Sequence, residues 1–169
     1  MKVLETDRLI LRWLSTDDAE FILELLNDPA FLRFIGDKGV RTLEDARNYI
    51  LNGPVDMYTR LGFGLYRVGL KESGIPIGIC GLIKRDGLDD VDLGFAFLPQ
   101  FRAQGYAYEA AAAVMTYGKV ALGLKRIVAI TSPDNDASGR LLEKLGLRFE
   151  RMIRLSAGAE EVRLFVSDF

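Results

Sequence analysis

The sequence has no histidine among its 169 residues. A Ser-His-Asp triad, a Cys-His pair and an HExxH zinc helix all need an imidazole, so this absence excludes each of them. Acid–base chemistry must therefore come from carboxylates, hydroxyls, lysines, tyrosines or water. Cysteine is nearly absent too, and the single one, Cys80, lies in an apolar run, which raises the pKa of a thiol. We expect Cys80 to be a buried core residue, with no disulfide within the chain and no CxxC metal site.

The chain also lacks a large excess of charge of one sign. Its 22 Lys and Arg against 24 Asp and Glu give a formal net charge of −2 at pH 7, without the basic surplus that is typical of nucleic-acid-binding proteins. Nowhere do about 18 apolar residues follow one another, as a membrane-spanning helix requires. Glu5, Asp7 and Arg8 interrupt the N-terminal stretch where a signal peptide would be apolar. These absences predict a cytoplasmic protein whose partners include neither nucleic acid nor membranes.

What is present is the composition of an ordinary globular protein, with 49% hydrophobic and 27% charged residues. A length of 169 residues suits one domain. No linker-like segment, charge block or repeat divides the chain. We therefore predict a single domain over residues 1–169.

Hydrophobic periodicity predicts the order of helices and strands. Alternation over residues 6–13 predicts a strand, and N-cap signals at Ser15 and Thr42 predict two helices after it. Turns rich in Gly and Asp separate the next strand patterns, which suits antiparallel hairpins. The later elements are expected as strands over 63–70, 77–84 and 91–98, a helix over 103–122, a strand over 126–131, a short helix from Asn135, and strands over 148–155 and 161–166. The order βααβββαβαββ predicts an α/β (α+β) fold with a mixed, mostly antiparallel sheet of about seven strands and helices on both faces.

Residues 102–107, RAQGYA, lie at the junction of a strand and the long helix, and they are the first segment with functional potential. Gly105 lets a ligand approach the backbone closely, and the first-turn N–H groups of the helix have no partners within it. Such groups bind anions, so the loop could hold a pyrophosphate. A plain tight turn explains the same residues, and neither a Walker A nor a GxGxxG motif is present.

The strand before this loop has two unlike faces. Side chains alternate along a strand, which places Leu93, Phe95 and Phe97 on one face and Asp92, Gly94 and Ala96 on the other. The small and acidic face leaves room for a ligand, although a lightly packed solvent face would have the same pattern.

A third segment, residues 135–146, begins the short helix. Asn135 as an N-cap and Ser138 as a polar first-turn residue have a purely structural explanation. Arg140 and Lys144, at i and i+4, form a positive ridge of the kind that more often faces solvent than a ligand.

Three ordered motifs nevertheless carry a resemblance that covers nearly the whole chain. They are ETDRLILR over residues 5–12, the block from Gly94 to Ala107, and the helix that begins at Asn135 and ends in EKLG over 143–146. Together they resemble the GNAT-type acyl-CoA N-acyltransferases, in particular the RimJ/RimL-like branch. Residues 102–107 resemble the cofactor motif of that family, R/Q-x-x-G-x-G/A.

The resemblance implies acetyl-CoA as the co-substrate and no metal. The strand before the loop would pair its backbone with the pantetheine arm, Asn135 would also reach pantetheine, and the loop would wrap the pyrophosphate. Arg102, Arg140 and Lys144 would offset the phosphate charge. The implied cofactor-binding residues are Phe95, Ala96, Phe97, Arg102, Ala103, Gln104, Gly105, Tyr106, Ala107, Tyr108, Asn135 and Arg140.

The implied reaction is direct attack of a primary amine on the thioester carbonyl, with backbone N–H groups near Phe97 stabilising the oxygen on which charge develops. An amine of pKa about 8–10 is mostly protonated at neutral pH, so a group must take its proton. We expect Asp92 to do so directly or through water, with Glu109 as the second candidate and a purely structural Asp92 as an open alternative. Many GNAT enzymes have a tyrosine where this chain has Leu142, which leaves Ser138 as the candidate proton donor to the thiolate.

Two other functions remain open from the sequence. The same fold could be a non-catalytic module that binds and senses acyl-CoA, or the motifs could be only turns and caps in a structural interaction domain. The RimJ/RimL-like branch implies either a ribosomal-protein N-terminus or a small amine as the acceptor. Phe31, Phe34 and Tyr58 could line the acceptor groove or belong to the core, and both a monomer and a homodimer are open.

Overall fold

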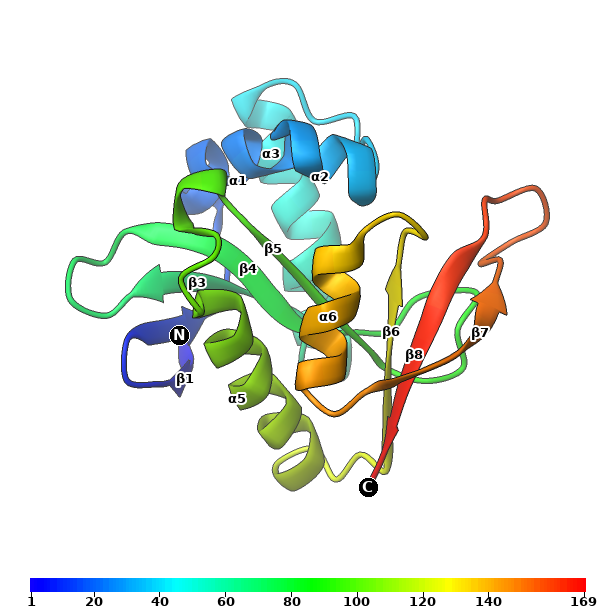
Figure 1. Cartoon of the computed structure of the whole chain (residues 1–169). Coiled ribbons are helices and arrows are strands. Elements are labelled where there is room, and N and C mark those ends of the chain that lie inside the picture. The colour runs from blue at the N-terminus through cyan, green and yellow to red at the C-terminus, as the bar shows by residue number, and fades with distance from the viewer.

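The computed structural model describes all 169 residues. Its centre is one sheet of eight strands in the order β1-β2-β3-β4-β5-β6-β8-β7 (Figure 1). Neighbouring strands are antiparallel except β5 and β6, which are parallel. The strands are β1 Lys2–Glu5, β2 Leu9–Arg12, β3 Leu65–Leu70, β4 Pro76–Ile83, β5 Asp92–Phe97, β6 Arg126–Thr131, β7 Arg148–Ile153 and β8 Val162–Asp168. The predicted mixed, mostly antiparallel sheet is confirmed, with one strand more than the pattern indicates.

The additional strand is β1. Residues 6–13, predicted as one strand, contain a turn in which the N–H of Thr6 donates to the carbonyl of Leu9 at 2.9 Å. Strand β2 therefore begins only at Leu9, and the residues before the turn pair antiparallel with it. A short strand followed by a tight turn leaves no clear break in the hydrophobic pattern, which is why the sequence indicates a single run.

Helices pack against both faces of the sheet, as predicted. Four of them, α1 (Ala19–Leu26), α3 (Leu43–Ile50), α5 (Tyr106–Val120) and α6 (Asp136–Lys144), correspond to predicted helices. No helix of the chain is both long and apolar enough to cross a bilayer.

Two helices, α2 (Pro29–Phe34) and α4 (Asp56–Leu61), are additional to the predicted order. Helix α2 begins at a cap in which the side chain of Asp28 accepts from the N–H of Phe31 at 3.3 Å. Helix α4 continues from α3 through a π-helical turn, Leu51–Val55. Each has only six residues, so neither is long enough for a helical period to be recognised.

The predicted start of the long helix at residue 103 is wrong, because α5 begins at Tyr106. Ala103 has a φ of 60° and Gly105 a φ of 85°, both in the left-handed region that ends or precedes a helix rather than continuing it. Residues 102–105 are therefore a loop, and a short 3-10 turn at Pro99–Phe101 connects it to β5.

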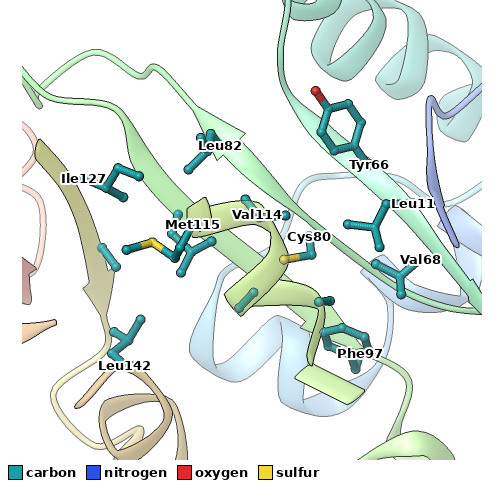
Figure 2. Packing of buried hydrophobic residues seen from close by; sticks show 14 of the residues in the cluster. Leu11, Tyr66, Val68, Cys80, Leu82, Phe97, Val114, Met115, Ile127 and Leu142 are labelled. Carbon is teal, nitrogen blue, oxygen red and sulfur yellow. The ribbon is translucent and has the colours of Figure 1, made fainter. Parts of the chain in front are cut away.

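Two hydrophobic clusters hold the helices on the sheet. Leu93 and Phe97 of β5 belong to the cluster under α5, whereas Ala96 packs against the cluster formed with α1 and α3. The predicted alternation of β5 thus separates the two faces. Figure 2 shows Val114 and Met115 of α5 among the sheet residues of the first cluster, including Leu82 and Cys80. Cys80 lies in this cluster, fully buried, and burial raises its thiol pKa, which confirms it as a core residue.

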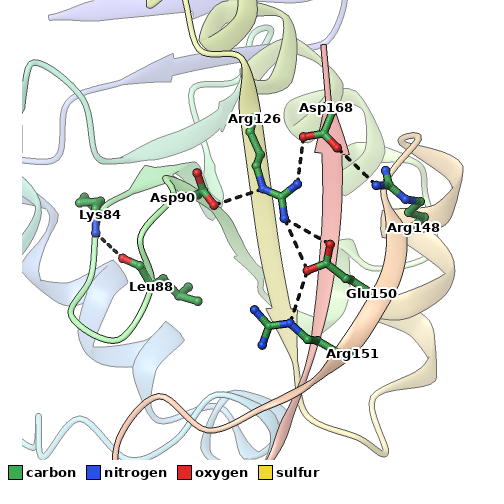
Figure 3. Close-up of polar contacts among 8 residues, drawn as sticks. All are labelled: Lys84, Leu88, Asp90, Arg126, Arg148, Glu150, Arg151 and Asp168. Carbon is green, nitrogen blue, oxygen red and sulfur yellow. Dashed lines mark hydrogen bonds and ion pairs between the residues drawn. The ribbon is translucent and has the colours of Figure 1, made fainter.

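An ion network ties the C-terminal strands to the loop that precedes β5. Arg126, the first residue of β6, contacts Asp90, Glu150 and Asp168, and Arg148 shares Asp168 (Figure 3). Its N–O distances to the three carboxylates lie between 2.9 and 3.3 Å. The network fixes β6, β7 and β8 at the end where β6 begins to pair with β5.

The pairing of β5 with β6 is short. A single register pair, Asp92 with Val128, joins them, and the N–H of Val128 donates to the carbonyl of Val91 at 3.0 Å. Beyond this point the two strands separate, so one edge of β5 is left open in the middle of the sheet. This opening is the feature of the fold that positions the candidate site.

Candidate active site

A cavity of about 530 Å³ lies where β5 and β6 have separated. Its walls come from the C-terminal half of β5, the loop before α5, the first turns of α5 and α6, and helices α1 and α2. Most of the lining side chains are hydrophobic, and the charged ones are Arg102 and Lys144. The predicted site residues that line it are Phe95, Ala96, Phe97, Arg102, Ala103, Gly105, Tyr106, Ala107, Tyr108, Asn135 and Ser138.

The backbone of Phe95 faces this cavity. On β5, the N–H of Leu98 donates toward β4, to Ile77, whereas the carbonyl of Val91 accepts from β6. Because backbone groups alternate in direction along a strand, the odd-numbered residues of β5 point their N–H and C=O groups toward β6. Past the Asp92–Val128 pair no residue of β6 is in register with them, so Phe95 offers a donor and an acceptor to an extended ligand.

The loop before α5 presents backbone donors to the same space. Gly105 is the N-cap of α5 in a left-handed conformation, and no side chain caps the helix. Intrahelical bonds begin when the N–H of Glu109 donates to the carbonyl of Gly105 at 3.0 Å. The N–H groups of Tyr106, Ala107 and Tyr108 are therefore free of helical partners, and together with the helix dipole they form an anion-binding position.

Arg102 is held in place by residues of the protein. Its Nε and Nη2 donate to the carbonyl of Phe97 at 3.0 and 2.8 Å, and Nη2 lies 2.7 Å from Oδ2 of Asp28. Asp28 is also the cap of α2. The guanidinium thus ties the end of β5 to the start of α2, and its charge is already paired.

Two predicted cofactor residues do not line the cavity. Gln104 is exposed and its side chain donates to the carbonyl of Gln100 at 2.9 Å, and Arg140 is exposed on α6. Lys144, one turn further along α6, does line the cavity, with Nζ 4.4 Å from the centre of the Tyr108 ring. The cation nearest the loop from α6 is therefore Lys144.

Asn135 and Ser138 form a pair at the start of α6. The Oδ1 of Asn135 accepts from the N–H of Ser138 at 3.2 Å, and its Nδ2 donates to Oγ of Ser138 at 3.1 Å. Arg163 fixes Asn135 from behind by donating to its carbonyl at 2.8 Å. Since Oγ of Ser138 accepts from the amide, its own proton is available to an acceptor in the cavity.

Asp92 lies at the point where β5 and β6 separate, outside the lining of the cavity. It is fully buried, and Arg85 lies against it with Nε–Oδ1 and Nη2–Oδ2 distances of 3.2 and 3.1 Å. Burial raises the pKa of this carboxyl, and the Arg85 charge opposes the shift only in part. A buried carboxyl with a raised pKa suits proton transfer better than a free one. This environment supports the role of Asp92 as the base, which stays a prediction.

Glu109, the second candidate base, is occupied by other contacts. It accepts from Oγ1 of Thr6 at 2.5 Å, from the N–H of Arg8 at 3.0 Å and from Nε of Arg8 at 2.7 Å. Partial burial alone would raise its pKa, but the hydrogen bonds from Thr6 and Arg8 outweigh burial and lower it. Glu109 does not line the cavity.

From the sequence, the aromatic residues Phe31, Phe34 and Tyr58 could either line the acceptor groove or belong to the core. Phe31 and Phe34 line the cavity from α2, together with Ile35, which the pattern does not single out. Tyr58 instead stacks between Trp13 and Tyr66, with ring centroids 4.7 and 5.4 Å apart, and is a core residue. The cap at Asp28-Pro29 is the one sequence signal that could have revealed α2 and its wall.

Comparison with known proteins agrees with this geometry. Residues 8–148 match the family model of the acetyltransferase (GNAT) domain. The chain is 34% identical over 154 residues to the uncharacterized N-acetyltransferase YoaA of Bacillus subtilis (strain 168), covering 90% of this chain and 86% of that protein. A GNAT-family acetyltransferase from Bacillus anthracis has the same fold at a TM-score of 0.80, with 28% identity and coverage of 99% of this chain and 98% of that one. In fold alone, the chain is also similar to the ribosomal-protein acetyltransferase RimL in complex with coenzyme A, with a TM-score of 0.83, 16% identity and coverage of 100% and 98% of the two chains.

Proposed function

The chain belongs to the GNAT acetyltransferase family, and we propose that it transfers the acetyl group of acetyl-CoA to a primary amine. One observation carries the proposal beyond the family. A single cavity combines the open edge of β5, the free N–H groups at the start of α5 and the Asn135–Ser138 pair. These three groups are suited, in that order, to an extended amide chain, an anion and a departing thiolate.

The proposed pose of acetyl-CoA follows the order of these groups. Phe95 would pair its backbone with the amides of the pantetheine arm, as in strand addition. The N–H groups of Tyr106, Ala107 and Tyr108 would hold the pyrophosphate, with Lys144 as the cation that α6 supplies beside them. Because Arg102 is already paired with Asp28, we assign it to shaping the loop rather than to neutralising phosphate.

Asp92 is the residue that we assign to proton removal from the amine. Its raised pKa brings a carboxylate closer to the pKa of the group it must deprotonate. Since Asp92 does not line the cavity, the proton would reach it through water. Glu109 is the poorer choice because three donors stabilise its ionised form and weaken it as a base.

Attack of the amine places negative charge on the thioester oxygen, and breaking of the C–S bond then releases a thiolate. The N–H of Phe97, which faces the separation of β5 and β6, is the proposed donor to that oxygen. Ser138 is the proposed donor to the sulfur, since its Oγ accepts from Nδ2 of Asn135 and its own proton stays available for donation. No protein-bound acyl group is needed in this sequence of steps.

The proposed acceptor is a primary amine that approaches along an apolar wall. Phe31, Phe34 and Ile35 of the α2 region and Leu25 of α1 line the cavity, and no carboxylate does. Both a protein N-terminus, including that of a ribosomal protein, and a small-molecule amine have the required group. Two further statements stay predictions from the sequence, namely the cytoplasmic location and the single domain over residues 1–169. The choice between a monomer and a homodimer stays open.

The test has two stages. Calorimetric titration with coenzyme A is expected to show binding at one site, and a panel of N-terminal peptides and small amines is then assayed for CoA release from acetyl-CoA. Release that depends on one acceptor class supports the proposal. Binding of coenzyme A without amine-dependent release by any acceptor would favour the alternative, a non-catalytic acyl-CoA sensor of the same fold.

A further inference from the structure

The turn between β1 and β2 is bonded to the loop that precedes α5. Thr6 and Arg8 belong to that turn, and both donate to the carboxylate of Glu109 in the first turns of α5, at 2.5 to 3.0 Å. The segments are about a hundred positions apart in the chain. The hydrogen bonds from the turn to α5 all go to this carboxylate, and one more goes to the carbonyl of Gln104 in the loop before the helix.

Arg8 contacts the loop in three different ways. Its Nε lies 2.7 Å from Oε1 of Glu109, its Nη1 donates to the carbonyl of Gln104 at 3.1 Å, and its guanidinium lies 4.3 Å from the centre of the Tyr106 ring. A Cβ placed on Gly105 would be 3.3 Å from Nη2 of Arg8. One guanidinium therefore contacts Gln104 and Tyr106 and lies close to the space that a side chain at Gly105 would occupy.

These contacts add to those that Arg102 and Gln104 make with the carbonyls of Phe97 and Gln100, and they act on a backbone with two left-handed residues. Ala103 is a non-glycine residue with a φ of 60°, and Gly105 has a φ of 85°. A left-handed conformation at a non-glycine residue carries a cost that neighbouring structure must offset. No side chain caps the start of α5, so contacts from outside the helix are what fix the direction of its free N–H groups.

We propose that Arg8, anchored by Glu109, is a positioning residue for the anion-binding loop and sets its affinity for the phosphates of coenzyme A. The inference rests on the proposed function, because it concerns the same ligand. It gives Glu109 a role in holding Arg8 rather than in proton transfer. The planar guanidinium is essential to it, since a lysine could satisfy one of the three contacts but not all of them.

The experiment measures coenzyme A binding by calorimetry in matched variants. Arg8→Met and Arg8→Lys are each expected to weaken binding about three- to tenfold, the scale of one charge-assisted contact. Lys71→Met is the matched control. The N–H of Lys71 donates to the carbonyl of Arg8 at 2.8 Å, but its ammonium pairs with Glu5 and not with the loop. The variant removes one positive charge from a neighbouring position without removing a contact to the loop, and less than a twofold change is expected.

Glu109→Gln provides a second route, which retains the shape of the side chain. It is expected to weaken binding by a similar factor, and the double variant with Arg8→Met should lose no more than the larger of the two single losses. Hydrogen exchange of the amides over residues 103–109 in the unliganded protein should rise in both single variants. A merely structural role would lower the melting temperature and leave the dissociation constant of the folded protein unchanged.

Three results would overturn the inference: unchanged affinity in folded Arg8→Met, full affinity in Arg8→Lys, or an equal loss in Lys71→Met, which would mean that charge alone matters. These results require that the unmodified protein binds coenzyme A. If it does not, the proposed function fails first, so the two failures are distinguishable.

Discussion

At the scale of single residues, the backbone at Gly105 makes the sharpest prediction. Its φ of 85° is strained for any residue with a Cβ, and valine there should cost about 1–2 kcal/mol of stability. The same Cβ and the distorted loop should weaken coenzyme A binding at least about tenfold, roughly 1.4 kcal/mol. Titration of Gly105→Val with coenzyme A measures this effect.

Gly123→Val is the matched control, because Gly123 also has a positive φ, 68°, and lies beyond the other end of α5. A Cβ added there would meet no atom within 4 Å. The variant should lose stability and keep its affinity for coenzyme A. Unchanged affinity in a folded Gly105→Val protein would contradict the assignment of the loop.

Asp92 should control the acid side of the pH–rate profile. The base works only when ionised, and burial raises the pKa of this carboxyl above its ordinary value of 3.8. The rate of the unmodified enzyme should therefore rise with pH through that raised pKa. In Asp92→Asn this rise should disappear and turnover should fall roughly a hundredfold, with coenzyme A affinity nearly intact. Full activity of the variant would transfer the role to water.

Ser138 has two separable roles. As a proton donor to the sulfur it acts only in the transition state, so Ser138→Ala should lower kcat and kcat/KM together and leave the melting temperature almost unchanged. As a partner of the Asn135 cap it would instead contribute stability, on the scale of about 0.5–2 kcal/mol. A melting curve and a steady-state assay on one preparation distinguish these roles. Earlier melting with normal turnover would remove Ser138 from the mechanism.

At the scale of helices and strands, the sequence predicts which elements form better than it predicts the residues at which they begin and end. Long periodic segments such as α5 and β4 leave a clear pattern, whereas β1, α2 and α4 are too short to show one. The pattern misplaces the start of α5 because helical periodicity continues through residues 103–105, where Ala103 and Gly105 are left-handed. The hydrophobic pattern carries no information on the backbone angle φ of Ala103.

The same limit applies to the candidate site. Motif spacing identifies the loop, the strand before it and the Asn135–Ser138 pair, and all three lie around one cavity. It does not tell which charged side chains point inward. The i, i+4 spacing of Arg140 and Lys144 places both on one side of the helix, yet only Lys144 reaches the cavity. The pairing of Arg102 with Asp28 depends on helix α2, which the pattern does not reveal.

The ion network at Arg126 makes a prediction at this scale, because it joins three strands and a loop. Arg126→Met should lower the free energy of unfolding by about 1 kcal/mol or somewhat more. In a chain of this size, each kcal/mol lost lowers the melting temperature by about 2–4 °C. Arg60→Met is the control, since Arg60 pairs only with Asp56 on an exposed helix face, and its effect should stay below about 0.5 kcal/mol. Thermal melts at low salt and at about 1 M salt measure both, and the Arg126 effect should shrink at high salt. An equal loss in the two variants would contradict a network effect.

At the scale of the whole molecule, paired carboxylates at the surface set the response to acid. The pKa values of Asp37, Asp45, Asp134 and Asp168 lie below their ordinary value because each accepts hydrogen bonds or faces an arginine. A carboxylate whose pKa is lower in the folded state stabilises the fold above its unfolded pKa, and this contribution is lost as pH falls through the folded value. These groups lie on separate elements, so the whole chain should lose stability gradually below about pH 4 to 5 rather than in one step.

The predicted loss of stability at low pH can be tested at a single residue, Glu5. Side-chain hydrogen bonds from Lys2 and Lys71 lower its pKa from 4.5 to about 2, with Nζ–O distances of 2.8 and 2.7 Å. Its contribution should be complete above pH 4.5 and be lost as the pH falls from there toward 2. Glu5→Gln should therefore be less stable than the unmodified protein at neutral pH, and the two urea-unfolding curves should converge as the pH approaches 2. Because both lysines are partly exposed, added salt should also reduce the difference at neutral pH. A difference that persists unchanged under acid conditions would mean that Glu5 stabilises the β1–β2 end by packing rather than by its charge.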